Sequence, residues 1–140
     1  MPSPHRPAVE AAVERIRHAL GPVGCLESPD RVAPYLVDFR GLYRGATPLV
    51  ACPASTAEVA AVLAICNETR TPVVPHGGNT SYCGGATPSA DGSQIVLSLH
   101  RLNRIREVDA ANFSMVAEAG CILADVQAAA EAADRFFPLS

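Results

Sequence analysis

The chain has 140 residues, of which 49% are hydrophobic and 18% are charged, so a folded domain with a core is expected rather than a disordered segment. The net charge is −3 and all 11 basic residues are arginines scattered along the chain, which argues against nucleic-acid binding. Because lysine is absent, a Walker-type phosphate lysine and a Schiff-base lysine are excluded, and a bound anion must be held by main-chain N–H groups, hydroxyls or arginines.

The first third of the chain predicts one helix and one strand. An apolar stripe predicts a helix over residues 8–20, which Gly21 and Pro22 end. Residues 23–48 are rich in proline and glycine and are expected to be irregular. The segment LVACPAS, residues 49–55, reads as a short strand with an exit turn.

The best-marked element is the helix that follows this strand. Ser55 and Glu58 form an S-x-x-E capping box, and helical apolar spacing continues to about Thr69. Residues 71–74 predict a brief strand, and the glycine-rich stretch PHGGNTSYCGG follows it directly. The order is that of a β-α-β unit that ends in a glycine-rich loop.

The rest of the chain alternates between apolar and polar residues. This pattern predicts strands over 94–99, 104–110 and 113–120, with a hairpin connection at 109–112, and a helix over 123–133. Together these elements indicate an α+β fold that is not a doubly wound sheet.

The glycine-rich loop carries the chemistry that the sequence offers. It does not match the G-x-G-x-x-G fingerprint and no suitable helix opens from it, so a Rossmann site is a poor interpretation. Its unobstructed N–H groups can converge on an anion, and Asn79, Thr80 and Ser81 can add donors. From these residues alone, an anion site and a wide connecting turn both remain open.

The five cysteines show no CxxC pair and no regular spacing, and no apolar signal core opens the sequence. They predict reduced, mostly buried thiols in a cytoplasmic protein, with no metal site. No apolar run reaches the length of a membrane span.

Several motifs in a fixed order resemble one family. PVVPHGGNTSYCGGATP, IVLSLHRLNRI, VDAANFSMVAEAGC, LADVQAAA and FPLS together resemble the FAD-binding domain of the p-cresol methylhydroxylase/vanillyl-alcohol oxidase superfamily. Within it, the sequence is most similar to the D-2-hydroxyglutarate and D-lactate dehydrogenase branch. The resemblance implies a lead-in segment over 1–37 and the N-terminal part of a PCMH-type FAD-binding domain over 38–140.

The resemblance also implies a cofactor and its contacts. The loop would wrap the FAD pyrophosphate through main-chain donors, and the final residues match the segment that approaches the flavin ring. The implied contacts are Pro75, His76, Gly77, Gly78, Asn79, Thr80, Ser81, Gly84, Gly85, Pro138, Leu139 and Ser140. Members that attach FAD covalently through this loop carry a histidine where this chain has Asn79, so non-covalent binding is expected. For His76, a phosphate contact and a solvated loop position remain open.

Other polar residues allow two interpretations. Arg40 and Arg44 could face an acidic substrate, or could belong to a loop held by salt bridges. Arg101, Arg104 and Arg106 are expected on a solvated strand face with no function. Cys83 and Cys121 are expected to be small packing residues.

The activity that the resemblance implies is oxidation of a D-2-hydroxy acid, such as 2-hydroxyglutarate or lactate, to its 2-oxo acid by an FAD-dependent dehydrogenase. No catalytic residue or metal ligand is assigned, because the family places them in a later glycine-rich stretch and a substrate-capping domain. We therefore expect a truncated piece that needs the missing C-terminal half as its structural partner. Two alternatives are an inactive fragment that binds FAD weakly or not at all, and an FAD oxidase of the same fold that acts on another alcohol.

Overall fold

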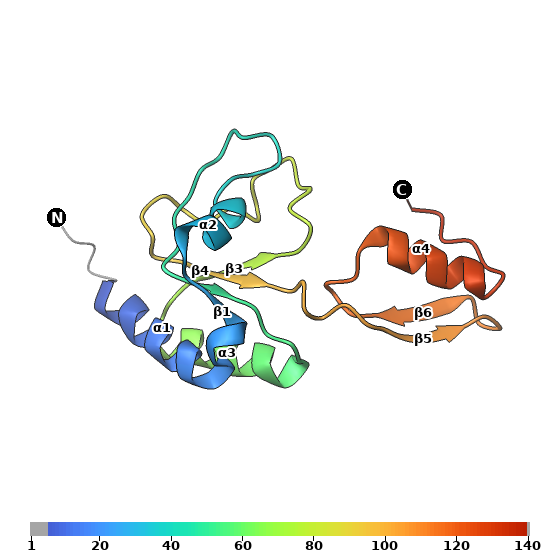
Figure 1. Ribbon diagram of the computed structural model, residues 1–140, viewed down its shortest axis with the longest axis horizontal. Coiled ribbons are helices and arrows are strands. Elements are labelled where there is room, and N and C mark those ends of the chain that lie inside the picture. The colour runs from blue at the N-terminus through green and yellow to red at the C-terminus, as the bar shows by residue number, and fades with distance from the viewer. Residues whose placement is uncertain (1–5, 140) are drawn as a thin grey trace.

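The computed structural model describes residues 6–139 and shows two lobes joined by one connection (Figure 1). The first lobe contains a four-stranded sheet with helices α1 (Arg6–Leu20) and α3 (Thr56–Glu68) on one side. The second lobe, orange to red in Figure 1, contains a two-stranded sheet and helix α4 (Leu123–Ala132).

The sheet of the first lobe has the strand order β1-β2-β4-β3. Its strands are β1 (Cys25–Leu26), β2 (Val50–Ala51), β3 (Val73–His76) and β4 (Ile95–Ser98). Strands β2, β4 and β3 run parallel, and β1 is antiparallel to β2. The expected β-α-β unit, β2-α3-β3, is present, but β4 is inserted between its two strands.

Apolar side chains bury both faces of this sheet, as is usual where strands run parallel. On one face, Ile16 of α1 and Val62 of α3 pack with Ile95 of β4. On the other face, helix α2 (Pro29–Val32) and the 3₁₀ turn η2 (Ala33–Tyr35) cover the strands. Helix α1 therefore shares one hydrophobic core with α3 and β4.

The local signals for α3 are confirmed. Ser55 Oγ accepts a hydrogen bond from Glu58 N at 3.1 Å, and Glu58 Oε2 accepts one from Ala54 N at 2.7 Å. The expectation for residues 23–48 is partly wrong, since they contain β1, α2, η2 and most of the 3₁₀ turn η1 (Pro22–Gly24). These elements are two to four residues long, too short for a periodic pattern to reveal them.

The second lobe is a hairpin covered by a helix. Strands β5 (Ile105–Asp109) and β6 (Ser114–Ala117) pair antiparallel, and α4 contacts β5. Asp109 Oδ1 accepts hydrogen bonds from Ala111 N and Asn112 N, which confirms the expected hairpin connection. Most large apolar side chains of this lobe are exposed: Val108, Phe113, Val116, Ile122, Leu123, Phe136 and Leu139.

The joint between the lobes is tightly built around Gly120. Its N–H donates to Leu102 O at 2.7 Å, and Leu102 N donates to Leu99 O at 2.9 Å. A Cβ on Gly120 would collide with the main-chain oxygen of Leu99. Of the helices within residues 6–139, none has the length and hydropathy required to cross a bilayer.

Candidate functional site

A cleft of about 450 Å³ lies where β3 and β4 end. His76 and Ser98 are register partners at the carboxyl ends of these parallel strands, so the segments that leave the two strands emerge side by side. Ligands of open α/β sheets bind at this edge. The cleft is lined by Leu26, Arg31, Pro34, Tyr35, His76, Gly77, Asn79, Ser98 and His100.

His76 forms part of the cleft wall and is 6% exposed, so the solvated alternative is wrong. Pro75 and His76 belong to β3 rather than to the loop. The ring lies 4.7 Å from the Tyr35 ring, and Nδ1 lies 3.3 Å from Ala86 O. Because a carbonyl only accepts, Nδ1 must carry the hydrogen of this bond. Burial lowers the pKa of His76, which favours a neutral ring whose Nε2 is an acceptor.

Three glycines of the loop leave its outer side open. A Cβ on Gly77 or Gly85 would meet no atom within 4 Å, and one on Gly78 would meet only Thr80 Cγ2, at 3.8 Å. None of the three has a left-handed backbone, so neither sterics within the chain nor φ requires glycine there. Their common effect is to let an external group approach the main-chain N–H groups closely. These exposed N–H groups are the donors that the expected FAD diphosphate contact would use.

Gly84 differs from these three glycines. Its φ is +68°, and a Cβ would lie 2.6 Å from the Tyr43 ring, so the fold itself requires glycine at this position. Asn79 also has a left-handed φ, of 54°, and its Nδ2 donates to Val37 O at 2.8 Å. One of the two Nδ2 hydrogens of Asn79, which the sequence suggested as donors to a ligand, is thus used within the chain. Thr80 and Ser81 are exposed.

The sequence did not point to four polar residues of the cleft, Arg31, Tyr35, Ser98 and His100. Ser98 is 1% exposed, and its Oγ lies 2.9 Å from His100 Nδ1. Arg31 and Tyr35 come from the segment that was expected to be irregular. Ser98 could have been found from the parallel pairing of its strand with β3, which sets it beside His76.

Arg40 and Arg44 lie outside this cleft. Among residues 6–139, neither guanidinium is ion-paired with a carboxylate, so the salt-bridged alternative is wrong. Arg40 lies 5.8 Å from the centroid of the Tyr82 ring. Arg44 lines a neighbouring cleft of about 500 Å³ together with Gly84 and Thr87. The structure therefore places the two arginines beside the glycine-rich loop.

The arginines of HRLNRIRE are not simply a solvated strand face. Arg101 Nη1 donates to Cys52 O at 2.8 Å. Arg104 and Arg106 pair with Glu118 at 3.1 and 2.9 Å, and the Glu118 side chain is only 3% exposed. Main-chain and side-chain hydrogen bonds from Arg104, with further bonds from Arg106, lower the pKa of Glu118 to about 2. Glu118 is thus a structural anchor that the sequence did not reveal.

The predicted flavin-ring segment lies in the other lobe. Pro138 and Leu139 are exposed, and Gln127 Nε2 donates to Leu139 O at 2.7 Å. Neither residue lines the cleft at the end of β3, and Ser140 lies outside the described residues. The structure therefore does not bring this segment together with the glycine-rich loop.

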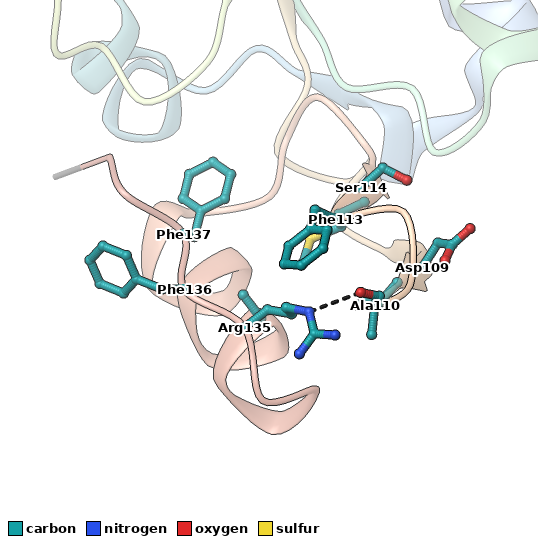
Figure 2. A pocket seen from close by; sticks show the side chains of 10 residues that line it. Asp109, Ala110, Phe113, Ser114, Arg135, Phe136 and Phe137 are labelled. Carbon is teal, nitrogen blue, oxygen red and sulfur yellow. Dashed lines mark hydrogen bonds between the residues drawn. The ribbon is translucent and has the colours of Figure 1, made fainter.

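The second lobe has a pocket of its own, of about 150 Å³, shown in Figure 2. Arg135 lies at its centre, where its Nε donates to Ala110 O at 2.8 Å and its guanidinium lies 4.7 Å from the Phe113 ring centroid. Phe136 and Phe137 also line it. Arg135 thereby ties the end of α4 to the hairpin.

The cysteines are all free, and Cys25, Cys52 and Cys66 are buried. Burial raises the pKa of Cys52 and of Cys66 to about 11, so both remain thiols at neutral pH. Cys83 is exposed, so its expected packing role is wrong. No cluster of three or more His, Cys, Asp or Glu suited to a metal ion occurs in the part of the chain that the structure describes.

Comparison with known proteins identifies the family. The profile of the FAD binding domain matches residues 47–140. The chain is 36% identical over 127 residues to a probable mitochondrial D-2-hydroxyglutarate dehydrogenase of Oryza sativa, covering 91% of this chain and 22% of that protein. It is 34% identical over 113 residues to the D-2-hydroxyglutarate–pyruvate transhydrogenase of Saccharomyces cerevisiae, covering 81% of this chain and 22% of that protein. The chain therefore spans about a fifth of the length of these curated relatives.

Solved structures agree on the fold. p-Cresol methylhydroxylase superposes with a TM-score of 0.77 at 23% identity, over 92% of this chain and 25% of that one. Alkyldihydroxyacetonephosphate synthase superposes with a TM-score of 0.76 at 15% identity, over 86% of this chain and 24% of that one. The α+β architecture is thus that of part of a PCMH-type FAD-binding domain, as the sequence indicated. The chain therefore belongs to the FAD binding domain family, whose model matches two thirds of its residues.

Proposed function

We propose that the chain binds FAD non-covalently, as part of a flavin-dependent oxidoreductase that converts a D-2-hydroxy acid to its 2-oxo acid. The observation that supports the cofactor site is the open space beside Gly77, Gly78 and Gly85 in the loop. The substrate class rests on the relatives, which are named for D-2-hydroxyglutarate and, in Bacillus subtilis, as a glycolate oxidase subunit.

The main-chain N–H groups of the loop would hold the diphosphate, since the chain has no lysine to neutralise it. Arg31 supplies a positive charge in the cleft beside the loop. A neutral His76 adds no charge, and its Nε2 is suited to a hydroxyl donor rather than to a phosphate oxygen. When bound, FAD accepts the hydride from the substrate carbon.

Non-covalent attachment follows from the residue at position 79. Where covalently linked members of the superfamily carry a histidine, this chain has Asn79, and a carboxamide is not a nucleophile towards flavin. The Asn79 side chain is also held by Val37 O. After denaturation, FAD should separate from the protein, and the absence of flavin fluorescence in the denatured protein band would show this.

We assign substrate binding and catalysis to segments that correspond to the rest of the relatives' length. We propose that those segments pack on this chain and supply the substrate base and any metal ligands. The exposed apolar side chains of the second lobe offer a surface for this packing. Arg40 and Arg44, which lack carboxylate partners within residues 6–139, are proposed to face the substrate carboxylate.

Titration of residues 1–140 with FAD, followed by flavin fluorescence and calorimetry, tests the cofactor site. The wild type should bind FAD, and Gly77→Val should abolish binding without lowering Tm, because the Cβ of the new side chain meets no atom of the chain within 4 Å. Ala90→Val, an exposed position of the same β3–β4 connection, is the matched control and should leave affinity unchanged. Equal affinity in Gly77→Val and the control would contradict the diphosphate cradle.

The same titration tests the competing proposal that this chain alone is an inactive module. The exposure of seven large apolar side chains in the second lobe favours that alternative. If the wild type shows no FAD binding, the module requires the segments that it lacks relative to its curated relatives. An oxidase of the same fold that acts on another alcohol would bind FAD equally well, so turnover assays with the segments that complete the relatives' length must separate the two chemistries.

A further inference from the structure

Residues 37–45, here called the strap, form a closed turn with a buried carboxylate at its base. Asp38 is 4% exposed, and its Oδ1 accepts from Tyr43 N at 2.7 Å while its Oδ2 accepts from Arg40 N at 3.1 Å. Val37 and Arg44 form a bridge across the turn, and Gly45 N donates to Leu36 O at 2.8 Å. The strap therefore has a defined conformation although it lies outside the sheet.

The strap contacts the glycine-rich loop at three places. Asn79 Nδ2 donates to Val37 O at 2.8 Å. The Tyr43 ring occupies the space beside Gly84 that a Cβ would need. Phe39 and Arg40 lie near Tyr82, at 6.1 Å between ring centroids and at 5.8 Å from guanidinium to centroid.

Two of these contacts fall on the loop residues with a left-handed backbone. Asn79 has a φ of 54° and Gly84 a φ of +68°, and no other residue between positions 71 and 91 has a positive φ. These residues set the direction of the main chain on either side of Thr80–Cys83. The strap thus holds the loop at its two residues with a left-handed backbone.

We propose that the strap is a positioning element, which fixes the shape of residues 78–85 before FAD binds, and that Asp38 and Asn79 act as positioning residues rather than as ligands. This inference rests on the proposed FAD site. A glycine-rich loop without such support would lose conformational entropy when a ligand orders it, and its affinity would fall accordingly. The exposed part of the loop remains free for the diphosphate because the strap contacts Asn79, Tyr82 and Gly84 and not the open glycines.

Amide hydrogen exchange of residues 1–140 without FAD, combined with FAD titration, tests this inference. Asp38→Asn replaces one of the two carboxylate oxygens that accept from the main-chain N–H groups of Arg40 and Tyr43. Asn79→Gly removes the side-chain bond to Val37 O while tolerating the positive φ. Tyr43→Ala removes the ring beside Gly84, and because Tyr43 is 50% exposed it leaves the core intact. Asp109→Asn is the matched control, since Asp109 also accepts two main-chain N–H groups, but in the other lobe.

Each strap variant should speed exchange at residues 78–85 by roughly 10-fold and weaken FAD binding by about 3- to 10-fold, while the control changes neither. The loss of FAD affinity in the double variant Asp38→Asn/Asn79→Gly should not exceed the larger of the two single-variant losses. The reason is that both substitutions loosen the same attachment.

Unchanged exchange at residues 78–85 in both Asp38→Asn and Tyr43→Ala would overturn the proposal. So would additive losses of affinity in the double variant with wild-type exchange, because Asn79 would then be a direct ligand. If wild-type residues 1–140 bind no FAD, the proposed function fails for this chain, but exchange in the free protein still decides whether the strap holds the loop.

Discussion

Arg104 binds both oxygens of the Glu118 carboxylate: its main-chain N–H reaches Oε2 at 3.0 Å and its guanidinium reaches Oε1 at 3.1 Å. Arg106 adds a second guanidinium at 2.9 Å. The pairing links the start of the β5–β6 hairpin to its end. Since only the carboxylate is buried, its removal leaves exposed arginines rather than an unpaired buried charge.

Glu118→Gln should lower Tm at pH 7 and flatten the acid dependence of stability. The folded pKa of Glu118, about 2, lies below its ordinary value of 4.5, so its stabilisation is complete above pH 4.5 and is lost as pH falls towards 2. Urea unfolding at pH 7, 4.5 and 2.5 measures this. Glu107→Gln, an exposed carboxylate on β5 of the same hairpin, is the control. Parallel pH profiles of wild type and Glu118→Gln would contradict the anchor.

His76 should titrate below the ordinary value of 6.5 because burial disfavours its charged form. The unfolded chain then binds the proton more tightly, so the contribution of His76 to stability is complete above pH 6.5 and falls as pH drops below it. Titration of the His76 ring signals by NMR measures the midpoint directly. His76→Leu should remove this part of the pH dependence. A midpoint at or above 6.5 would rule out the neutral, buried ring.

Gly120→Ala should destabilise the protein by about 1–3 kcal/mol, because the new Cβ collides with the main chain at Leu99 and the backbone must move. Gly77→Ala is the matched comparison and should change the free energy of unfolding by less than about 0.5 kcal/mol, since its Cβ meets open space. Denaturant unfolding of both variants checks the contrast. Equal effects would mean that the joint between the lobes is not sterically tight.

Ser55→Ala should cost about 1 kcal/mol, the usual effect of removing an N-cap oxygen. The reason is that Glu58 N loses its acceptor at the start of α3. Thr56→Ala removes a neighbouring exposed hydroxyl and serves as the control. Thermal unfolding monitored by circular dichroism should show the drop in Tm for Ser55→Ala alone.

The elements that the sequence predicted correctly are those with local causes. Helix α3 follows from Ser55 and Glu58, which lie three residues apart, and the hairpin follows from Asp109 and the two N–H groups just after it. The glycine-rich loop was also recognisable, because glycines without an evident turn type point to a close approach by another group.

The features that the sequence did not reveal depend on distant contacts. His76 is buried because β4 pairs beside it and Tyr35 covers its ring, and neither neighbour is close in sequence. Glu118 meets Arg104 and Arg106 across 14 and 12 positions. The two-residue strand β1 has no period to detect. Long-range pairing of this kind leaves no mark in a local pattern.

The central place of β4 has a consequence for how the protein is made. Strands β2 and β3 leave the ribosome before they can be held in one sheet. Strand β4, which pairs with both of them, is synthesised only after the glycine-rich loop. Until residue 98 is available, the parallel sheet cannot close, and His76 has no strand beside it. Closure of the sheet and completion of the cleft therefore both wait for the synthesis of β4, and a nascent chain that ends before β4 has no cleft.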